Sequence, residues 1–345
     1  MKHTISRSLL AACAAGIVFS AHADTLRMSH FWPANSDVNK EIFEAWAKHV
    51  EEATGGELAV ENYPSQTLSR SEQAYQGTVN GISDIAITMQ GYTAGRFPLS
   101  EIVQLPGVST SAPQGGCILQ TLYDEGHIAD EYDDVKVLYL FTTGPAYLHT
   151  RGHEIEAPDD LRGLRIRRPS DVAGEILERL GANPVGMPAP DIYTSLQRGV
   201  MDGLSFPWQA MKTFGINELA DHHLEVPYYT GVAVAVMNRE SYERLSPEQQ
   251  AAIDEVSGMT WTRRAGEVYA RLDREGREEA EAQGGTINTV EDPLNDPDWS
   301  GPLNEGTEAY LARLEQRGID NAREVYQRAL ELRDECRVEP AEERD

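Results

Sequence analysis

The sequence has little cysteine, little lysine and no long apolar run. Three cysteines among 345 residues exclude a disulfide-dense scaffold and a metal site built on paired C-x-x-C motifs. Only five of the 30 basic residues are lysines, and 56 acidic residues give a formal charge of −26. This charge excludes a nucleic-acid-binding surface, and an acidic, Lys-poor surface is typical of proteins that stay soluble in high salt. No stretch approaches 18 apolar residues, so no transmembrane helix is predicted.

Catalytic and cofactor motifs are also missing. The sequence contains no G-x-S-x-G elbow, no H-E-x-x-H, no phosphate-binding P-loop and no G-x-G-x-x-G. The stretch 296–301 (DPDWSG) matches the first half of a calcium loop, but Thr307 stands where a bidentate Glu is required. It is better interpreted as a turn before a helix. His222 and His223 could form a metal ligand pair, but adjacent residues point in different directions, so one site rarely uses both. They are expected on the surface. We expect no enzyme, no metal and no cofactor.

The first 23 residues have the features of a secretory signal peptide. Lys2 and Arg7 give a positive start, and 9–20 (LLAACAAGIVFS) is a short apolar run. Ala21-His22-Ala23 is an A-x-A cleavage site, so cleavage is predicted after Ala23. The expected location of the mature protein is therefore the periplasm.

A lipoprotein box ending at Cys13 is disfavoured, because it would leave almost no apolar run before the cysteine. The mature chain then begins at Asp24 and carries 28 basic and 56 acidic residues, a formal charge of −28.

Two cysteines, Cys117 and Cys336, remain in the mature chain. One disulfide is possible, but the sequence does not show that these two cysteines meet.

The periodicity of the mature chain predicts an α/β fold. It begins with strands at 25–29, 58–63 and 85–87, separated by helices at 35–53 and 70–79. This β-α-β-α-β order implies a parallel sheet with helices on its faces. Further strands are expected at 135–141, 164–167, 203–206 and 232–237, and helices at 172–180 and 191–200. From about residue 246 the pattern is helical, with 308–336 as the last long element.

Two segments of the chain resemble each other. Residues 76–84 (QGTVNGISD) and 196–202 (LQRGVMD) each combine a helix end, a turn and an Asp before a buried strand. Two similar α/β lobes would produce such a similarity. Chance would also produce it, because helix-Gly-strand junctions are common.

An arginine cluster lies at 162–168, where the predicted strand ends at Pro169. Alternation along the strand puts Arg165 and Arg167 on the same face. A guanidinium at the carboxyl end of a strand lies where α/β folds bind ligands, and its planar fork suits a carboxylate. A surface arginine paired with Asp159 or Asp160 is an equally good interpretation of the pattern.

Aromatic side chains gather where the predicted strands end. Each one alone is more typical of the core, but together they suit a ligand cleft with apolar walls. They are Phe31, Trp32, Tyr92, Tyr147, Phe206, Trp208, Tyr228 and Tyr229.

Three segments carry more specific motifs. They are 80–86 (NGISDIA), 160–169 (DLRGLRIRRP) and 191–203 (DIYTSLQRGVMDG). In order and spacing, from about residue 25 to 260, the chain resembles the solute-binding proteins of TRAP transporters (tripartite ATP-independent periplasmic transporters). The resemblance implies that Arg167 grips a ligand carboxylate. It also implies a monomer that captures a small organic acid and passes it to TRAP membrane subunits driven by an ion gradient.

The resemblance implies a periplasmic-binding-protein-like fold with two lobes, mixed sheets, a hinge and a long helix across both lobes. The expected first lobe is 24–145 plus 232–270, and the second is 146–231 plus 271–345. Crossings between them are placed near 145, 232 and 270.

The chain departs from sugar-acid-binding members of the family. No second arginine stands near Tyr147, and Phe206 replaces an Asn, with Trp208 beyond it. A monocarboxylate with a less polar or aromatic body is therefore favoured. Arg70 could supply another charge, although a surface role is at least as plausible. The residues expected at the ligand are Arg167, Phe206, Trp208, Tyr147, Tyr92, Trp32, Phe31 and Arg70.

Two other functions are compatible with the pattern. A binding protein of an ATP-driven importer, or a sensor, would share the fold. A secreted hydrolase is disfavoured, because no nucleophile–base pair is recognisable in the sequence.

Overall fold

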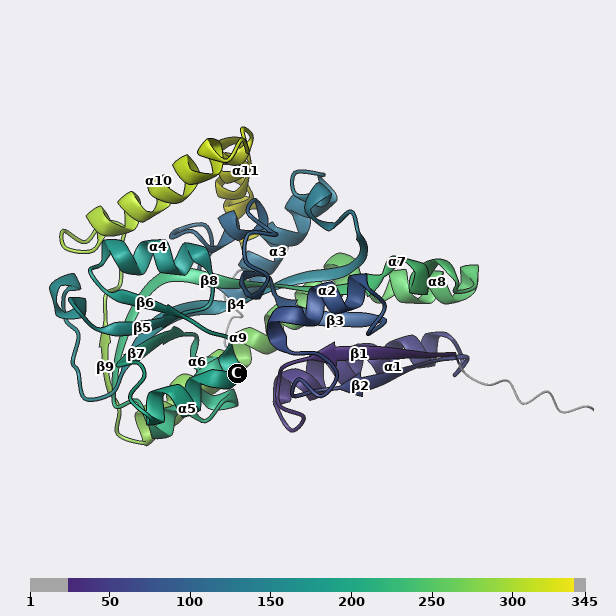
Figure 1. The fold of residues 1–345 in the computed structure, drawn as a ribbon, viewed down its shortest axis with the longest axis horizontal. Helices are drawn as coiled ribbons and strands as arrows, with labels where there is room; N and C mark the ends of the chain where they lie inside the picture. Colours follow the sequence, from purple (N-terminus) through teal and green to yellow (C-terminus); the bar gives the residue numbers. More distant parts are fainter. Residues whose placement is uncertain (1–23, 338–345) are drawn as a thin grey trace, which may run out of the picture.

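A computed structural model of the chain describes residues 24–337 (Figure 1). The predicted signal peptide lies outside the described residues. Within them, nine strands form one mixed sheet in the order β2-β1-β3-β8-β4-β7-β5-β6, with β9 paired to β8. The strands are β1 (Asp24–His30), β2 (Leu58–Tyr63), β3 (Ile85–Met89), β4 (Val135–Thr150), β5 (Arg165–Arg168), β6 (Asn183–Gly186), β7 (Gly203–Phe206), β8 (His222–Asn238) and β9 (Thr286–Thr289).

Helices lie on both faces of the sheet (Figure 1). The α-helices are α1 (Ala45–Ala53), α2 (Ala74–Val79), α3 (Ala112–Asp124), α4 (Asp171–Arg179), α5 (Ile192–Gln197), α6 (Trp208–Thr213), α7 (Arg239–Glu243), α8 (Pro247–Glu255), α9 (Gly258–Ala282), α10 (Ser300–Gln316) and α11 (Ala322–Glu335). The shorter helical turns are η1 (Asn39–Glu44), η2 (Ser71–Gln73), η3 (Gln90–Tyr92), η4 (Ser100–Gln104), η5 (Ala129–Tyr132), η6 (Pro158–Leu161), η7 (Ala189–Asp191) and η8 (Ile216–Glu218).

Local sequence explains where several helices begin. The Ser170 hydroxyl accepts the N–H of Ala173 at the start of α4, and Ser246 with Gln249 forms a capping box at the start of α8. β1 pairs in parallel with both β2 and β3, as the opening β-α-β-α-β pattern predicts.

The long central strands β4 and β8 join the two ends of the sheet. β8 pairs with β3 through Ala233–Met237, whereas β4 pairs with β7 through Tyr147–Thr150. We call the β1–β3 side the first half and the β5–β7 side the second half. The predicted strands 135–141 and 232–237 are shorter than β4 and β8. Register shifts between Val137 and Leu148 of β4 mark bulges or irregularities that let the ladder continue past Gly144-Pro145.

The resemblance between 76–84 and 196–202 reflects a shared junction. Asp84, before β3, accepts the backbone N–H of Arg27 at 2.9 Å and its Nε–H at 3.1 Å. Asp202, before β7, accepts the backbone N–H and Nε–H of Arg165 at 2.9 and 3.0 Å. In each half a carboxylate therefore joins the start of one strand to the strand that pairs with it in parallel.

The C-terminal segment contacts both halves. The predicted single element 308–336 is wrong, because the chain turns at Gly318, which has φ of +82°, and forms α10 and α11. α10 packs on α4 and α11 packs on α3. Cys336, at the end of α11, forms a disulfide with Cys117 of α3.

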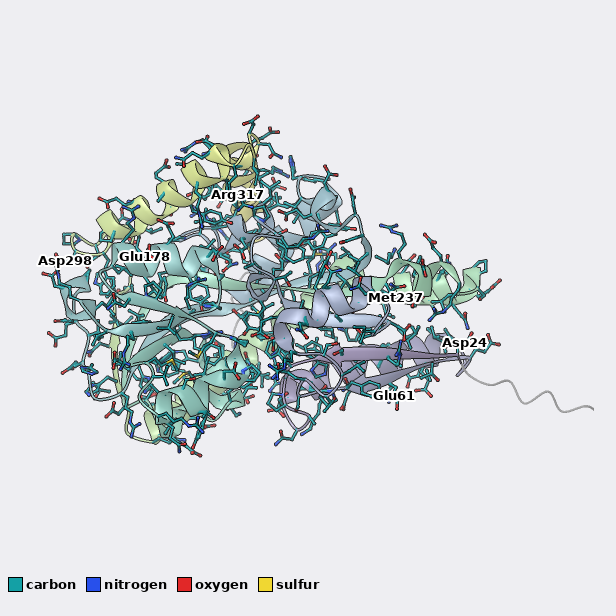
Figure 2. The ribbon with its side chains drawn as sticks, in the orientation of Figure 1. Asp24, Glu61, Glu178, Met237, Asp298 and Arg317 are labelled. Atoms are coloured by element: carbon teal, nitrogen blue, oxygen red, sulfur yellow. A yellow bond between two sulfur atoms is a disulfide. The ribbon has the colours of Figure 1, made fainter. Side chains whose placement is uncertain are left out.

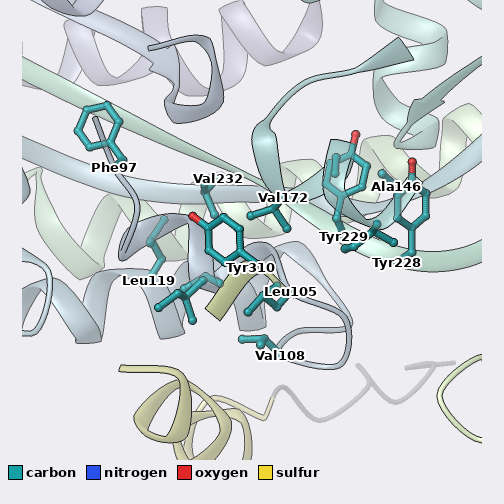
Figure 3. Close-up of a cluster of buried hydrophobic side chains, with 14 of the residues drawn as sticks. Phe97, Leu105, Val108, Leu119, Ala146, Val172, Tyr228, Tyr229, Val232 and Tyr310 are labelled. Carbon is teal, nitrogen blue, oxygen red and sulfur yellow. The ribbon is translucent and has the colours of Figure 1, made fainter. Parts of the chain in front are cut away.

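Two clusters of buried side chains make up the core, one of which is shown in Figure 3. In that cluster Tyr310 of α10 lies among Leu105, Leu119 and Val232 (Figure 3). Its members come from α3, α4, β8, α10 and α11, so a continuous core links the C-terminal helices to the sheet. The labelled Glu61, Glu178 and Asp298 are among the acidic side chains on the outside (Figure 2).

Replacing both Cys117 and Cys336 by serine should lower the free energy of unfolding by about 2–4 kcal/mol. The disulfide joins residues 219 positions apart, and its removal restores conformations to the unfolded chain. Urea unfolding at pH 7 measures the change. A reductant should lower the midpoint of the wild type but leave that of the double variant unchanged. Equal midpoints for the oxidised wild type and the variant would show that the bond contributes no stability.

Candidate functional site

A narrow cavity lies at the carboxyl ends of parallel strands from both halves. Phe31 and Trp32 follow β1, Tyr92 follows β3, Arg167 lies in β5 and Phe206 ends β7. The volume of the cavity is about 30 Å³ for the centre of a water-sized sphere. A cavity of this volume suits a small ligand. The lining is completed by Met89, Thr143, Pro169, Ala189, Pro207, Gln209, Ala210, Phe214, Tyr229, Gly231 and Tyr269.

The walls are mainly aromatic. In the first half, Phe31 and Trp32 stack with ring centroids 3.8 Å apart. In the second half, the rings of Phe206 and Phe214 lie 5.9 Å apart, and Phe214 lies nearly parallel to Phe31 at 6.3 Å. Aromatic surfaces of both halves therefore enclose the cavity and offer stacking contacts to a planar ligand.

Arg167 is the charged residue of the cavity wall. Its neighbours in the arginine cluster form ion pairs: Arg162 with Asp159, Arg165 with Asp202 and Arg168 with Asp171. Arg167 forms no ion pair with any residue of 24–337, although its side chain is only 1% exposed. A buried cation is costly unless it is paired and hydrogen-bonded. The Arg167 site therefore favours an anion.

The guanidinium of Arg167 is held by neutral groups. Its Nε–H donates to the Met187 carbonyl at 2.9 Å, Nη1 to the Ser205 carbonyl at 3.3 Å and Nη2 to the Tyr92 hydroxyl at 3.2 Å. Its Cζ lies 5.1 Å from the centre of the Phe206 ring. A guanidinium has five N–H donors, so one on each Nη has no acceptor among the described residues. Two such donors can bind both oxygens of a carboxylate.

Tyr92 adds a third donor beside Arg167. Its hydroxyl oxygen accepts from Arg167 and from the backbone N–H of Ala189 at 2.9 Å. Its own O–H proton has no acceptor among the described residues. Burial raises the pKa of Tyr92, although the Arg167 charge acts in the opposite direction. The hydroxyl therefore stays protonated at neutral pH and can donate to an anion held by Arg167.

Five of the eight residues expected at the ligand line this cavity: Phe31, Trp32, Tyr92, Arg167 and Phe206. The other three are placed elsewhere.

Trp208 lies behind the wall, where its indole N–H donates to Glu225 at 2.8 Å. Tyr147 packs against Trp208 with ring centroids 6.2 Å apart. Arg70 is exposed and precedes η2. None of these three side chains belongs to the cavity lining as the structure describes it.

Sequence reasoning does not identify two tyrosines of the wall as site residues. Tyr229 is one of the grouped aromatics, but it lies in the part of β8 before 232–237, and periodicity predicts only 232–237 as strand. Its hydroxyl donates to the Ser205 carbonyl at 3.2 Å, and burial raises its pKa to about 12 against the effect of Arg167. Tyr269 lies in α9, where the sequence carries no signal that separates a ligand contact from a core residue.

The expectation that His223 lies on the surface is wrong. His223 is 3% exposed, and its Nδ1 lies 2.9 Å from Nδ1 of the buried His149. Nε2 of His149 lies 2.9 Å from the Phe206 carbonyl and must donate to it. Nδ1 of His149 then accepts, so His223 donates through its own Nδ1. The pair supports Phe206 from behind the cavity.

The half-match to a calcium loop forms a turn before α10. The Asp296 carboxylate accepts the backbone N–H groups of Asp298 and Trp299 at 2.9 and 3.2 Å. Across residues 24–337, no group of three or more His, Cys, Asp or Glu side chains could hold a metal ion.

Comparison with known proteins decides the family. Residues 28–298 match the bacterial extracellular solute-binding proteins of family 7. The chain belongs to this family. A solute-binding protein of Chromohalobacter salexigens is 28% identical over 250 residues, which is 69% of this chain and 71% of that relative.

Two solved structures are more similar still. A TRAP solute-binding protein of Rhodoferax ferrireducens, determined with copurified benzoate, is 32% identical with a TM-score of 0.86, covering 90% of this chain and 98% of that one. A marine metagenome TRAP solute-binding protein, described as specific for aromatic acid ligands and bound to 3-hydroxybenzoate, is 30% identical with a TM-score of 0.86. The match covers 92% of this chain and 99% of the metagenome protein.

These matches confirm the predicted membership among TRAP solute-binding proteins and the two-lobed α/β fold. They also confirm transport as the function of the family to which the chain belongs. Among residues 24–337, no helix combines the length and apolarity that crossing a membrane requires.

The buried His149 and His223 should make the protein less stable as the pH is lowered from about 6.5 to 4. Burial lowers the pKa of His223 to about 4 and that of His149 well below its usual value, whereas an unfolded histidine takes up its proton near 6.5. At these two sites the unfolded state binds more protons in this window, which lowers stability as pH falls. The raised pKa values of the buried Glu101, Glu131 and Asp273 act in the opposite direction, so the histidine contribution is measured by difference. For His223 alone it should be about 2 kcal/mol between pH 7 and pH 5, from urea unfolding of the wild type and a His223 variant.

His223→Asn provides the matched control. The amide can still donate to His149, but one titrating ring is gone. The variant should lose less stability than the wild type between pH 7 and pH 5. An identical loss in both proteins would exclude His223 as a source of the pH dependence.

Proposed function

We propose that the cavity binds a small monocarboxylate with a flat, largely apolar body, such as an aromatic acid. The observation that carries this proposal is the buried guanidinium of Arg167, which has no acid partner among the described residues. Its two remaining N–H donors and the Tyr92 hydroxyl offer three hydrogen bonds to one anionic group. A bidentate carboxylate matches the fork geometry of an arginine.

The rest of the lining limits the ligand to one charge and favours a planar body. Among the described residues that line the cavity, Arg167 alone is positively charged. Phe31, Trp32, Phe206 and Phe214 leave few polar contacts for a sugar-like body. The aromatic acids bound by the two similar TRAP proteins support the same ligand class.

The chain acts as a TRAP solute-binding protein, which captures its ligand and delivers it to ion-driven membrane subunits. The resemblance to two TRAP proteins favours this system over an ATP-driven importer or a sensor. A hydrolase is not supported, because the described cavity lining contains no Ser, Cys, His, Asp or Glu for a nucleophile–base pair.

We propose in addition that residues 1–23 direct export and are removed after Ala23. The positive start, the short apolar run and the A-x-A site support this. A family of extracellular solute-binding proteins is consistent with a periplasmic location.

Arg167→Ala should weaken binding of benzoate by roughly 30-fold to several thousand-fold. The variant leaves the carboxylate desolvated without its partner, which costs about 2–5 kcal/mol for a buried charge pair. Arg167→Lys should recover only part of the affinity, because an ammonium cannot supply two parallel hydrogen bonds. Calorimetric titration measures each affinity.

Arg165→Ala is the matched control, because Arg165 pairs with Asp202 outside the cavity. It should bind benzoate as the wild type does. Affinity of Arg167→Ala within twofold of the wild type would remove Arg167 from the site and with it the argument for an acid.

We also propose that 24–145 plus 232–270 and 146–231 plus 271–316 move as two lobes, and that α11 moves with the first lobe, to which the disulfide between Cys117 and Cys336 ties it. Two contacts between the halves support a closed arrangement: Tyr92 with Arg167, and the Ser170 hydroxyl donating to Gln104 at 2.7 Å. Ligand should favour closure, because it stabilises the closed contacts. Small-angle scattering should show a smaller radius of gyration with saturating benzoate. An unchanged radius, with binding established by calorimetry, would contradict lobe closure.

A further inference from the structure

The hydroxyl of Tyr269 stands apart from the other hydroxyls of the cavity wall. It is buried and has no hydrogen-bond partner among the described residues. By contrast, the Tyr229 hydroxyl donates to Ser205, and the Thr143 hydroxyl donates to the Gly144 carbonyl at 2.8 Å. A buried polar group without a partner costs free energy. Within a ligand cavity, the missing partner can come from the ligand.

The indole of Trp32 lies near the Tyr269 hydroxyl but does not give it a hydrogen-bond acceptor. Burial raises the pKa of Tyr269, and Trp32 has a smaller opposing effect, although the two groups do not reach hydrogen-bonding geometry. An indole N–H can only donate. Even if the Trp32 indole came closer, the Tyr269 proton would have no acceptor. The O–H of Tyr269 is therefore available as a hydrogen-bond donor.

Tyr269 and Arg167 reach the cavity from different elements of the fold. Arg167 comes from β5 of the second half, and Tyr269 comes from α9. Each brings a polar group to a lining that is otherwise rich in aromatic rings.

The position of Tyr269 is fixed by close packing of α9 on both sides. A Cβ at Gly266 would lie 2.7 Å from Cα of Pro113 at the start of α3, and one at Gly276 would collide with the Trp208 carbonyl at the start of α6. These approaches are possible only for glycine. Because α9 is held against both α3 and α6, the side chain of Tyr269 has a defined position in the cavity wall.

We infer that the preferred ligand carries a second polar group, away from its carboxylate, that accepts a hydrogen bond from the Tyr269 hydroxyl. This inference rests on the proposed function, since it assigns the carboxylate to Arg167. The ligand class is an aromatic acid with a hydroxyl or other oxygen substituent on its ring or side chain. An acid without this group leaves Tyr269 unpaired, so the site discriminates against it.

Calorimetric titration of wild type and Tyr269→Phe with benzoate, 3-hydroxybenzoate and 4-hydroxybenzoate tests the inference. The quantity measured is the ratio of hydroxybenzoate affinity to benzoate affinity. At least one hydroxybenzoate should bind the wild type about 2- to 12-fold more tightly than benzoate, the range expected for one neutral hydrogen bond. Tyr269→Phe should bring this ratio close to one.

Tyr139→Phe is the matched control. Tyr139 is also buried with an unpaired hydroxyl, but it does not line the cavity. This variant should keep the wild-type ratio, and thermal unfolding should show that both variants fold. The inference alone is overturned if Tyr269→Phe keeps the wild-type ratio. It is also overturned if the wild type binds benzoate at least as well as both hydroxybenzoates. A wild type that binds none of the three acids overturns the proposed function as well.

Discussion

The Arg167 guanidinium places a positive charge where the protein offers no negative one. Carbonyl groups of Met187 and Ser205 and the ring of Phe206 compensate it partly, and each comes from a segment that follows or ends a strand of the second half. Carbonyl dipoles can orient a cation, but they do not neutralise it, so a strong preference for an anion remains at this point.

The aromatic walls strengthen that preference. Apolar rings keep water away from the guanidinium, and a lower local dielectric makes its attraction to a carboxylate stronger than it would be in water. The wall residues Phe31 and Trp32 come from one half, and Phe206 and Phe214 come from the other. Neither half alone makes the site, so the charge is fully enclosed only when both halves are together.

Local patterns were sufficient to predict the parallel opening of the sheet, the strand that carries Arg167 and most of the aromatic wall. Each depends on short-range alternation and on the rule that ligands bind beyond strand ends. The full length of β4 was not predictable, because the bulges around Gly144-Pro145 depend on pairing with β8. Tyr269 and the buried pair of His149 and His223 depend on contacts between distant segments, which leave no periodic signal.

The bond between Cys117 and Cys336 turns most of the chain into a covalent ring. The ring includes β4, β8 and α9, the elements that run between the halves, together with every segment of the second half. It can close only after the 219 positions that follow Cys117 have been synthesised. Once formed, the bond holds the last helix of the described residues against α3, so the return of the chain end to the first half becomes covalent.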